Sequence, residues 1–203
     1  MPERFTGGFV QTNCYLMETP GGSHLLVDAP AGSAAWLKAR NIVPAALLLT
    51  HQHYDHVEDA AAVAAMGVKI YAHTAYSPAL TLEEMMRGFG MPVHVQPYTV
   101  DELLAGKTEL EIGGLSLELA HVPGHSPDSV TFFARATGEL FSGDTLFADS
   151  IGRPDLPGGD GPLLIDGIRE KLFALPESTQ VLPGHGPATT IGAERAGNPY
   201  CGD

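Results

Sequence analysis

The stretch Thr50-His51-Gln52-His53-Tyr54-Asp55-His56 decides how the rest of this sequence is interpreted. Three imidazoles and one carboxylate, those of His51, His53, Asp55 and His56, fall within six consecutive positions. Both side-chain types bind divalent metal ions, and a purely structural segment would gain nothing from such a density of them. We therefore interpret these four residues as metal ligands.

The segments on either side of this cluster place it on a turn from a strand to a helix. Residues 45–49 are a short apolar run that predicts a buried strand, and residues 57–66 are alanine-rich with two acidic residues in the first turn, which predicts a helix. In a tight turn His51 and His53 can point one way, while Asp55 and His56 point towards a second position. This arrangement favours a site with two metal ions.

Length and composition predict one domain that spans residues 1–203. Hydrophobic residues make up 44% of the chain, enough for a sizeable core, and no linker-like stretch divides it. The chain has 24 Asp and Glu residues and 11 Lys and Arg residues, which gives a formal net charge of −13 at pH 7. Such a surface repels phosphodiesters and anionic lipids, so we expect no nucleic-acid partner and no membrane partner.

Cysteine usage and the termini predict a cytoplasmic protein. Cys14 and Cys201 are too few for a disulfide framework and lack zinc-finger spacing, so we expect two free thiols. The N-terminus lacks the basic and apolar regions of a secretory signal, and no apolar run approaches the roughly 20 residues of a membrane span. The sequence leaves the oligomeric state open.

Turn signals and hydrophobic periodicity divide the chain into short elements. Proline and glycine at residues 20–22 predict a first β-hairpin, and Gly113-Gly114 lies between alternating segments that predict a second. We expect strands at residues 9–19, 23–27, 45–49, 69–73, 110–112, 115–119, 130–133, 139–141 and 179–182. We expect helices at residues 32–40, 57–66, 78–87, 163–175 and 191–196.

Three further residues of ligand type each follow a predicted strand, directly after a glycine: His125, Asp144 and His185. Glycine lets the backbone turn sharply and present the next side chain at the edge of a sheet. Together with the cluster, they can form a site of three histidines beside a site of carboxylates and histidines, with Asp144 as the bridge. The first site would use His51, His53 and His125, and the second would use Asp55, His56, Asp144 and His185.

The motifs HxHxDH at 51–56, PGHS at 123–126, SGD at 142–144 and PGHGP at 183–187 resemble those of the metallo-β-lactamase-fold hydrolases. Within that family the chain is most similar to the short, single-domain glyoxalase II-like group, which comprises hydroxyacylglutathione hydrolase-like enzymes. The resemblance extends from Asn13 to Pro199. It implies an α/β fold, a four-layer αββα sandwich of two mixed β-sheets flanked by helices.

The chain also departs from parts of that family. The longer glyoxalase II enzymes carry a C-terminal helical domain that contacts glutathione, whereas 18 residues follow His185 here, so the thiol of the substrate stays open. No cysteine lies among the expected ligands, unlike in the β-lactamases of the family that use one. The persulfide dioxygenases of the same superfamily share much of this pattern.

Resemblance and ligand chemistry together predict a thioesterase with a small-molecule acyl-thioester substrate. Its cofactors would be two divalent transition metals, zinc first, with iron or manganese accepted by the same ligands. A metal-bridging hydroxide would attack the carbonyl, and a thiolate leaves without a proton. Asp55 and Asp144 would be catalytic because they hold the hydroxide as well as the metals. An iron-dependent persulfide dioxygenase and a lactonase are the alternatives.

Three other residues have two interpretations each. Arg153 can bind an anionic group of the substrate or pair with Asp155. Tyr54 can contact the substrate or pack beneath the ligands. Asp28, which ends a predicted strand, can hydrogen-bond to a ligating histidine or cap a turn.

Overall fold

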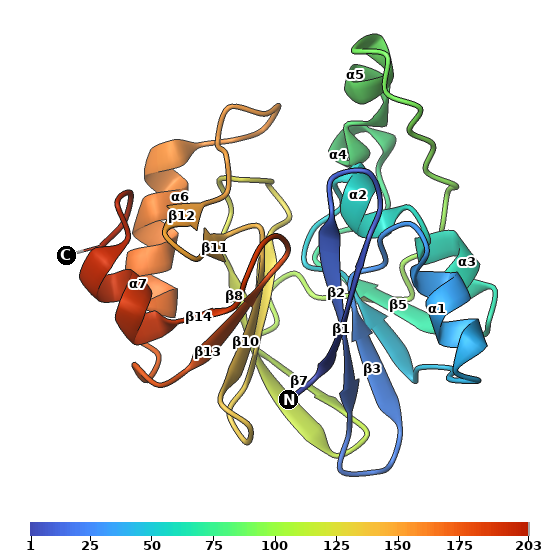
Figure 1. Cartoon of the computed structure of the whole chain (residues 1–203), viewed down its shortest axis with the longest axis horizontal. Helices are drawn as coiled ribbons and strands as arrows, with labels where there is room; N and C mark the ends of the chain where they lie inside the picture. The colour runs from blue at the N-terminus through green and yellow to red at the C-terminus, as the bar shows by residue number, and fades with distance from the viewer. Residues whose placement is uncertain (203) are drawn as a thin grey trace. The chain divides into compact units, whose positions relative to one another are not determined.

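Two six-stranded β-sheets form the framework of the computed structural model, which describes residues 1–202 (Figure 1). The chain divides into two compact units, and each contains one sheet, except that the turn Ile112–Leu115 between β7 and β8 of the second sheet belongs to the first unit. The first unit comprises Met1–Ala105 and Ile112–Leu115, and the second comprises Gly106–Glu111 and the chain from Ser116 onward. The single domain over residues 1–203 stays a prediction.

The first sheet has the strand order β1-β2-β3-β4-β5-β6. Its first three strands pair antiparallel, and β3 to β6 pair parallel, so the sheet is mixed. Its strands are β1 (Glu3–Gly7), β2 (Thr12–Glu18), β3 (His24–Val27), β4 (Ala46–Leu48), β5 (Lys69–Ala72) and β6 (Glu102–Leu103). The helices of this unit are α1 (Ser33–Ala39), α2 (Tyr54–Val57), α3 (Ala60–Ala64), α4 (Pro78–Thr81) and α5 (Glu83–Gly88).

One core holds the first unit together. Helices α1 and α3 lie on the same side of the sheet (Figure 1). Leu37 and Val63 from these helices pack in one buried cluster with Leu26, Leu47 and Ile70 from adjacent strands. Removing such side chains from water is the main stabilising contribution, on the order of 2 kcal/mol for each large aliphatic side chain. This core fixes where β4 ends and α2 begins.

The second sheet has the strand order β14-β13-β10-β9-β8-β7 and is also mixed, because β10 pairs parallel with β13 and antiparallel with β9. Its strands are β7 (Glu109–Ile112), β8 (Leu115–His121), β9 (Val130–Ala134), β10 (Glu139–Gly143), β13 (Gln180–Pro183) and β14 (Thr189–Thr190). A separate hairpin consists of β11 (Leu146–Phe147) and β12 (Ser150–Ile151). The helices are α6 (Gly161–Gly167), a following π-helical turn (Ile168–Leu172) and α7 (Ile191–Gly197). Leu164 and Ile168 pack with Leu140 and Val181 of the sheet.

Residues 57–66 do not form the single helix that the sequence predicts. They form the end of α2 and then α3, with Asp59 between the two helices. The Asp59 carboxylate accepts hydrogen bonds from the backbone N–H groups of Gly32 (3.0 Å) and Ala34 (2.9 Å). It therefore caps the start of α1 in place of extending its own helix.

The predicted helix at residues 78–87 is also interrupted. Leu82 adopts a left-handed conformation with φ of 57° and separates α4 from α5. The Thr81 hydroxyl donates to the Pro78 carbonyl oxygen (2.8 Å) and accepts from the backbone N–H of Glu83 (3.3 Å). These side-chain bonds compete with the helical backbone pattern.

The predicted strand at residues 9–19 begins later than expected. β2 starts at Thr12, after a turn in which Gly8 and Gln11 have positive φ values of 71° and 60°. The residues before this turn form β1, which the sequence analysis did not predict and which pairs antiparallel with β2. The helix predicted at residues 163–175 is α6 followed by the π-helical turn, which ends at Leu172. The other predicted strands and helices appear within a few residues of their expected bounds.

The predicted α/β class with two mixed sheets is confirmed. Among residues 1–202, no helix combines the length and the apolar character that crossing a membrane requires.

Candidate metal centre

The histidine-rich stretch lies where the sequence predicts it, on the turn from β4 to α2. His51, His53, Asp55 and His56 are all buried. The ring centroid of His51 lies 4.6 Å from that of His53 and 4.1 Å from that of His56. The His56 Nε2 lies 3.5 Å from the Asp55 Oδ2. The four residues of the first unit therefore gather their ligand groups in one place.

Asp28 fixes the orientation of this turn. Its Oδ1 accepts from the backbone N–H of Thr50 (2.8 Å), and its Oδ2 accepts from the Thr50 hydroxyl (2.8 Å) and lies 2.8 Å from the His56 Nδ1. A carboxylate only accepts, so the Nδ1 of His56 carries the proton and its Nε2 keeps a lone pair for a metal. Of its two interpretations, the structure supports Asp28 as the partner of an expected ligand.

The same hydrogen-bond chain orients His51. The Thr50 hydroxyl, which donates to Asp28, lies 3.2 Å from the His51 Nδ1. Because its hydrogen is already used, the hydroxyl accepts from the Nδ1–H of His51, and the Nε2 of His51 is left as the ligand atom.

Two partners of the ligand turn escaped the sequence analysis. Thr12, at the start of β2, donates its hydroxyl hydrogen to the Asp55 Oδ2 over 2.6 Å in a buried position. Gln52, fully buried between two ligands, donates to the Thr74 hydroxyl (3.1 Å) and accepts from the Tyr98 hydroxyl (3.2 Å). No local pattern marks Thr12, whereas the position of Gln52 inside the cluster is a signal that was overlooked.

His125, Asp144 and His185 gather at the strand ends of the second unit. Asp144 directly follows β10, and His185 comes two residues after β13. The Asp144 Oδ2 lies 3.5 Å from the His125 Nε2 and 3.4 Å from the His185 Nε2. His125 and Asp144 are buried, and the His185 side chain is partly exposed. Within this unit the three side chains therefore lie close together, and the role of Asp144 as a metal bridge stays a prediction.

A backbone carbonyl orients His125. The His125 Nδ1 lies 2.9 Å from the Arg153 carbonyl oxygen, so the Nδ1–H donates and the Nε2 faces Asp144. The loop that supplies this carbonyl passes very close, because a Cβ at Gly152 would lie 1.9 Å from the Asp144 carbonyl oxygen and 2.9 Å from the His125 Cβ. Only glycine fits at position 152.

The distances between these side chains fit a metal ion. Two ligands at Zn–N or Zn–O distances of about 2.0–2.1 Å and a tetrahedral angle lie about 3.4 Å apart. The His56–Asp55, His125–Asp144 and His185–Asp144 pairs measure 3.5, 3.5 and 3.4 Å, longer than ordinary N–H···O hydrogen bonds. The imidazole and carboxylate donors of both units thus fit transition-metal ions.

Arg153 and Tyr54 have contacts that agree with their alternative interpretations. The Arg153 guanidinium forms a two-point ion pair with Asp155 at 2.7 Å for both contacts, and this pairing lowers the pKa of Asp155 to about 2. Tyr54 packs in the core of the first unit, where burial and the nearby Asp55 raise its pKa to about 12. Substrate contacts of either residue stay predictions.

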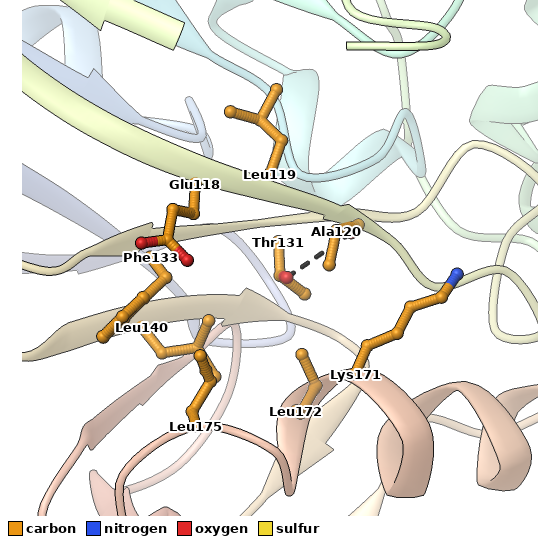
Figure 2. A pocket seen from close by; sticks show the side chains of 9 residues that line it. All are labelled: Glu118, Leu119, Ala120, Thr131, Phe133, Leu140, Lys171, Leu172 and Leu175. Atoms are coloured by element: carbon orange, nitrogen blue, oxygen red, sulfur yellow. Dashed lines mark hydrogen bonds between the residues drawn. The ribbon is translucent and has the colours of Figure 1, made fainter. Parts of the chain in front are cut away.

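A pocket on the second unit is lined by residues other than these ligands. Figure 2 shows the nine side chains that line it, which come from β8 to β10 and from residues 171–175. Its volume is ≈ 90 Å³. Its two charged residues are engaged elsewhere, because Glu118 pairs with Arg135 and Lys171 donates to the His121 carbonyl oxygen (2.6 Å). None of the nine residues is an expected metal ligand.

Sequence comparison places these motifs in a known family. The profile of the Metallo-beta-lactamase superfamily matches residues 7–185. The hydroxyacylglutathione hydrolase GloC of Haemophilus influenzae is 35% identical over 198 residues, which cover 94% of this chain and 92% of that protein.

Solved structures agree with this match. The crystal structure of the BLEG-1 B3 metallo-beta-lactamase is 39% identical with a TM-score of 0.89 and covers 99% of both chains. The crystal structure of TTHA1623 in a di-iron-bound form is 35% identical with a TM-score of 0.84, covering 98% of this chain and 99% of that one. The expected family resemblance is therefore confirmed, and the chain belongs to the metallo-β-lactamase superfamily.

Proposed function

We propose that this member of the superfamily is a dinuclear metal-dependent hydrolase that cleaves acyl-thioesters. The proposal keeps the sequence prediction that the seven expected ligands serve one centre in a single domain of residues 1–203. The observation that carries the proposal is the set of 3.4–3.5 Å separations between histidine Nε2 atoms and aspartate oxygens, which are those of ligands sharing a metal. The proposed first site uses His51, His53 and His125, the second uses Asp55, His56 and His185, and Asp144 belongs to both.

His51, His53, Asp55, His56, His125, Asp144 and His185 would hold the two metal ions. Bound there, the ions would lower the pKa of a water molecule towards neutrality and polarise the acyl carbonyl. Asp55 and Asp144 are the anionic members of the ligand set, and their oxygens would orient the reacting water. The Thr12 hydroxyl fixes the rotamer of Asp55, while Asp28 and the Arg153 carbonyl fix the tautomers of His56 and His125.

The leaving group favours a thioester. A thiolate departs without a proton, whereas an amine must be protonated as it leaves. The 35% identity to a hydroxyacylglutathione hydrolase supports the same substrate class. Zinc is our first choice of metal, since His and Asp ligands suit it. The di-iron form of a 35% identical relative supports iron as the alternative, and manganese accepts the same ligands.

β-Lactam hydrolysis is the second candidate. It is favoured by the 39% identity to a structure described as a B3 metallo-beta-lactamase. The same centre would attack a strained cyclic amide, and the nitrogen leaving group would need a proton from solvent. The persulfide dioxygenase and lactonase alternatives stay predictions from the sequence.

One set of assays separates these functions. Metal-replete protein is tested on lactoyl-thiols, a chromogenic β-lactam and acyl lactones, and oxygen uptake is followed after addition of a persulfide. We expect turnover of the thioesters, and Asp144→Asn is expected to abolish it and to lower metal occupancy at both sites. His185→Ala is expected to empty mainly the second site. A protein that consumes oxygen with persulfide and leaves every thioester intact would contradict the proposal.

The substrate contacts, the partners and the cellular location are predictions within this proposal. If Arg153 binds an anionic group of the substrate, Arg153→Ala raises KM and leaves kcat unchanged. Tyr54→Phe tests whether the Tyr54 hydroxyl takes part. We expect a small-molecule substrate, no nucleic-acid or membrane partner and a cytoplasmic location, and the oligomeric state stays open.

A further inference from the structure

Helix α7 carries a buried polar pair that the proposed function does not use. Glu194 is 2% exposed and Asn198 is 5% exposed. Burial of a carboxylate costs free energy unless hydrogen bonds satisfy its oxygens. The groups that donate these hydrogen bonds to Glu194 therefore indicate which segment it anchors.

Glu194 and Asn198 form hydrogen bonds with the β11–β12 hairpin. The Glu194 Oε2 accepts from the backbone N–H of Asp149 (2.9 Å) and from the Asn198 Nδ2 (2.8 Å), and its Oε1 accepts from the Thr189 hydroxyl (2.5 Å). The Asn198 Nδ2 also donates to the Ser150 carbonyl oxygen (3.1 Å). Asp149, at the tip of the hairpin, has a positive φ of 55°, a conformation that hydrogen bonds help to hold.

The hairpin continues directly into the residues that orient His125. After β12 come Gly152, which passes against Asp144 and His125, and Arg153, whose carbonyl oxygen accepts from the His125 Nδ1. The backbone N–H of Gly152 donates to the Thr145 carbonyl oxygen over 3.3 Å, near the long limit for such a bond. The position of the Arg153 carbonyl therefore depends on the anchorage of the hairpin at its other end.

We infer that Glu194 and Asn198 are positioning residues for the metal centre, acting through the β11–β12 hairpin and the Arg153 carbonyl on His125. The inference rests on the proposed function, because it takes His125 as a metal ligand. In this inference the Glu194–Asn198 pair helps to orient His125, although neither residue is bonded to His125. Loss of the pair lets the Arg153 carbonyl move and so weakens the metal that His125 holds.

The test measures metal release as well as stability. Zinc-loaded wild-type protein and variants are mixed with an excess of a chromophoric chelator, and the amount and rate of zinc release are recorded beside the thermal midpoint. Glu194→Ala removes all three bonds of the carboxylate. Glu194→Gln can keep its contacts, with the amide oxygen accepting from Asp149 and Asn198 and the amide N–H donating to the Thr189 hydroxyl.

Thr190→Ala is the matched control. The Thr190 hydroxyl caps α7 by accepting from the backbone N–H of Ala193 (3.2 Å) and is not bonded to the hairpin. Its loss destabilises the same helix without touching the chain of contacts to His125. Asn198→Ala provides a second test variant, because it removes the bond that Asn198 donates to Ser150, while the bonds that Glu194 accepts from Asp149 and Thr189 remain.

We expect Glu194→Ala to release one of its two zinc ions about tenfold faster than wild type. Asn198→Ala should change release in the same direction, Glu194→Gln should restore the wild-type rate, and Thr190→Ala should lower only the thermal midpoint. Wild-type release rates in Glu194→Ala and Asn198→Ala, or equal acceleration by Thr190→Ala, would overturn the inference while the proposed function stands. A wild-type protein that binds none of zinc, iron or manganese would overturn the proposed function itself.

Discussion

Asp28→Asn tests whether the Asp28 carboxylate orients the expected ligand His56. Asparagine has nearly the same shape and also tolerates the positive φ of 62° found at this position. Its amide oxygen can still accept from the backbone N–H of Thr50. Its NH2 group would replace the Oδ2 that lies 2.8 Å from the His56 Nδ1, so two donors would face each other.

This conflict has a defined cost. His56 can avoid it by moving its proton from Nδ1 to Nε2, which removes the lone pair that a metal needs. A hydrogen bond to a charged group contributes roughly 1.5–3 kcal/mol. At about 1.4 kcal/mol for each factor of ten, the metal held by His56 should bind roughly 10- to 100-fold more weakly. The NH2 group would also face the Thr50 hydroxyl that orients His51, so the metal at the other proposed site should bind more weakly as well.

Competition with a chelator of known affinity measures this loss, with Asp101→Asn as the control. Asp101 also lies in the first unit, and its carboxylate accepts from the backbone N–H of Ile70 (2.8 Å), so the control makes the same charge change away from the ligands. Asp28→Asn protein that binds both metals as tightly as Asp101→Asn would refute the role of Asp28. Nitrogen NMR of the imidazoles would report the tautomer of His56 directly.

Three further predictions follow from other contacts. Gly152→Ala should prevent stable metal binding, because the added Cβ would lie 1.9 Å from the Asp144 carbonyl oxygen; metal content equal to wild type would contradict this. Both thiols should resist a thiol reagent at pH 8 in the native protein and react after unfolding. Burial raises the pKa of Cys14 and raises that of Cys201 to about 11, which leaves about one Cys201 in a thousand ionised at pH 8. Asp155 should titrate near pH 2 and shift towards its ordinary pKa of 3.8 in Arg153→Gln. Because the folded pKa is lowered, the small contribution of this exposed ion pair to stability is present above pH 4 and disappears as the pH falls towards 2; carboxylate NMR titrations of both proteins measure the shift.

The candidate ligand residues can be picked out from the sequence because their residue types and spacing form local patterns. Ligand-type residues within six positions, and ligand-type residues that follow glycine at strand ends, carry a signal that needs no tertiary information. The strands and hairpins were predictable for the same reason, since turn residues and alternation act over a few positions. Asp144 thus directly follows β10 as expected, and His125 lies in the loop between β8 and β9.

The residues that orient the ligands could not be predicted in this way. Thr12 and Asp55 are 43 residues apart in sequence, and Gln52 and Tyr98 are 46 apart. These hydrogen bonds form only after the sheet has brought distant segments together, so no local pattern announces them. The break at Asp59 has the same origin, because its carboxylate bonds to the backbone of Gly32, 27 residues away. The break at Leu82 is local, because the Thr81 hydroxyl bonds to Pro78 and Glu83 in a sequence with good helix propensity.

The central claim, a two-metal centre made from seven ligands, is tested most directly by anomalous diffraction from crystals of the metal-replete protein at the absorption edge of the bound metal. Two peaks roughly 3.5–4 Å apart are predicted, with Asp144 within bonding distance of both. One peak should contact His51, His53 and His125, and the other Asp55, His56 and His185. A single peak, or two peaks on other residues, would contradict the account.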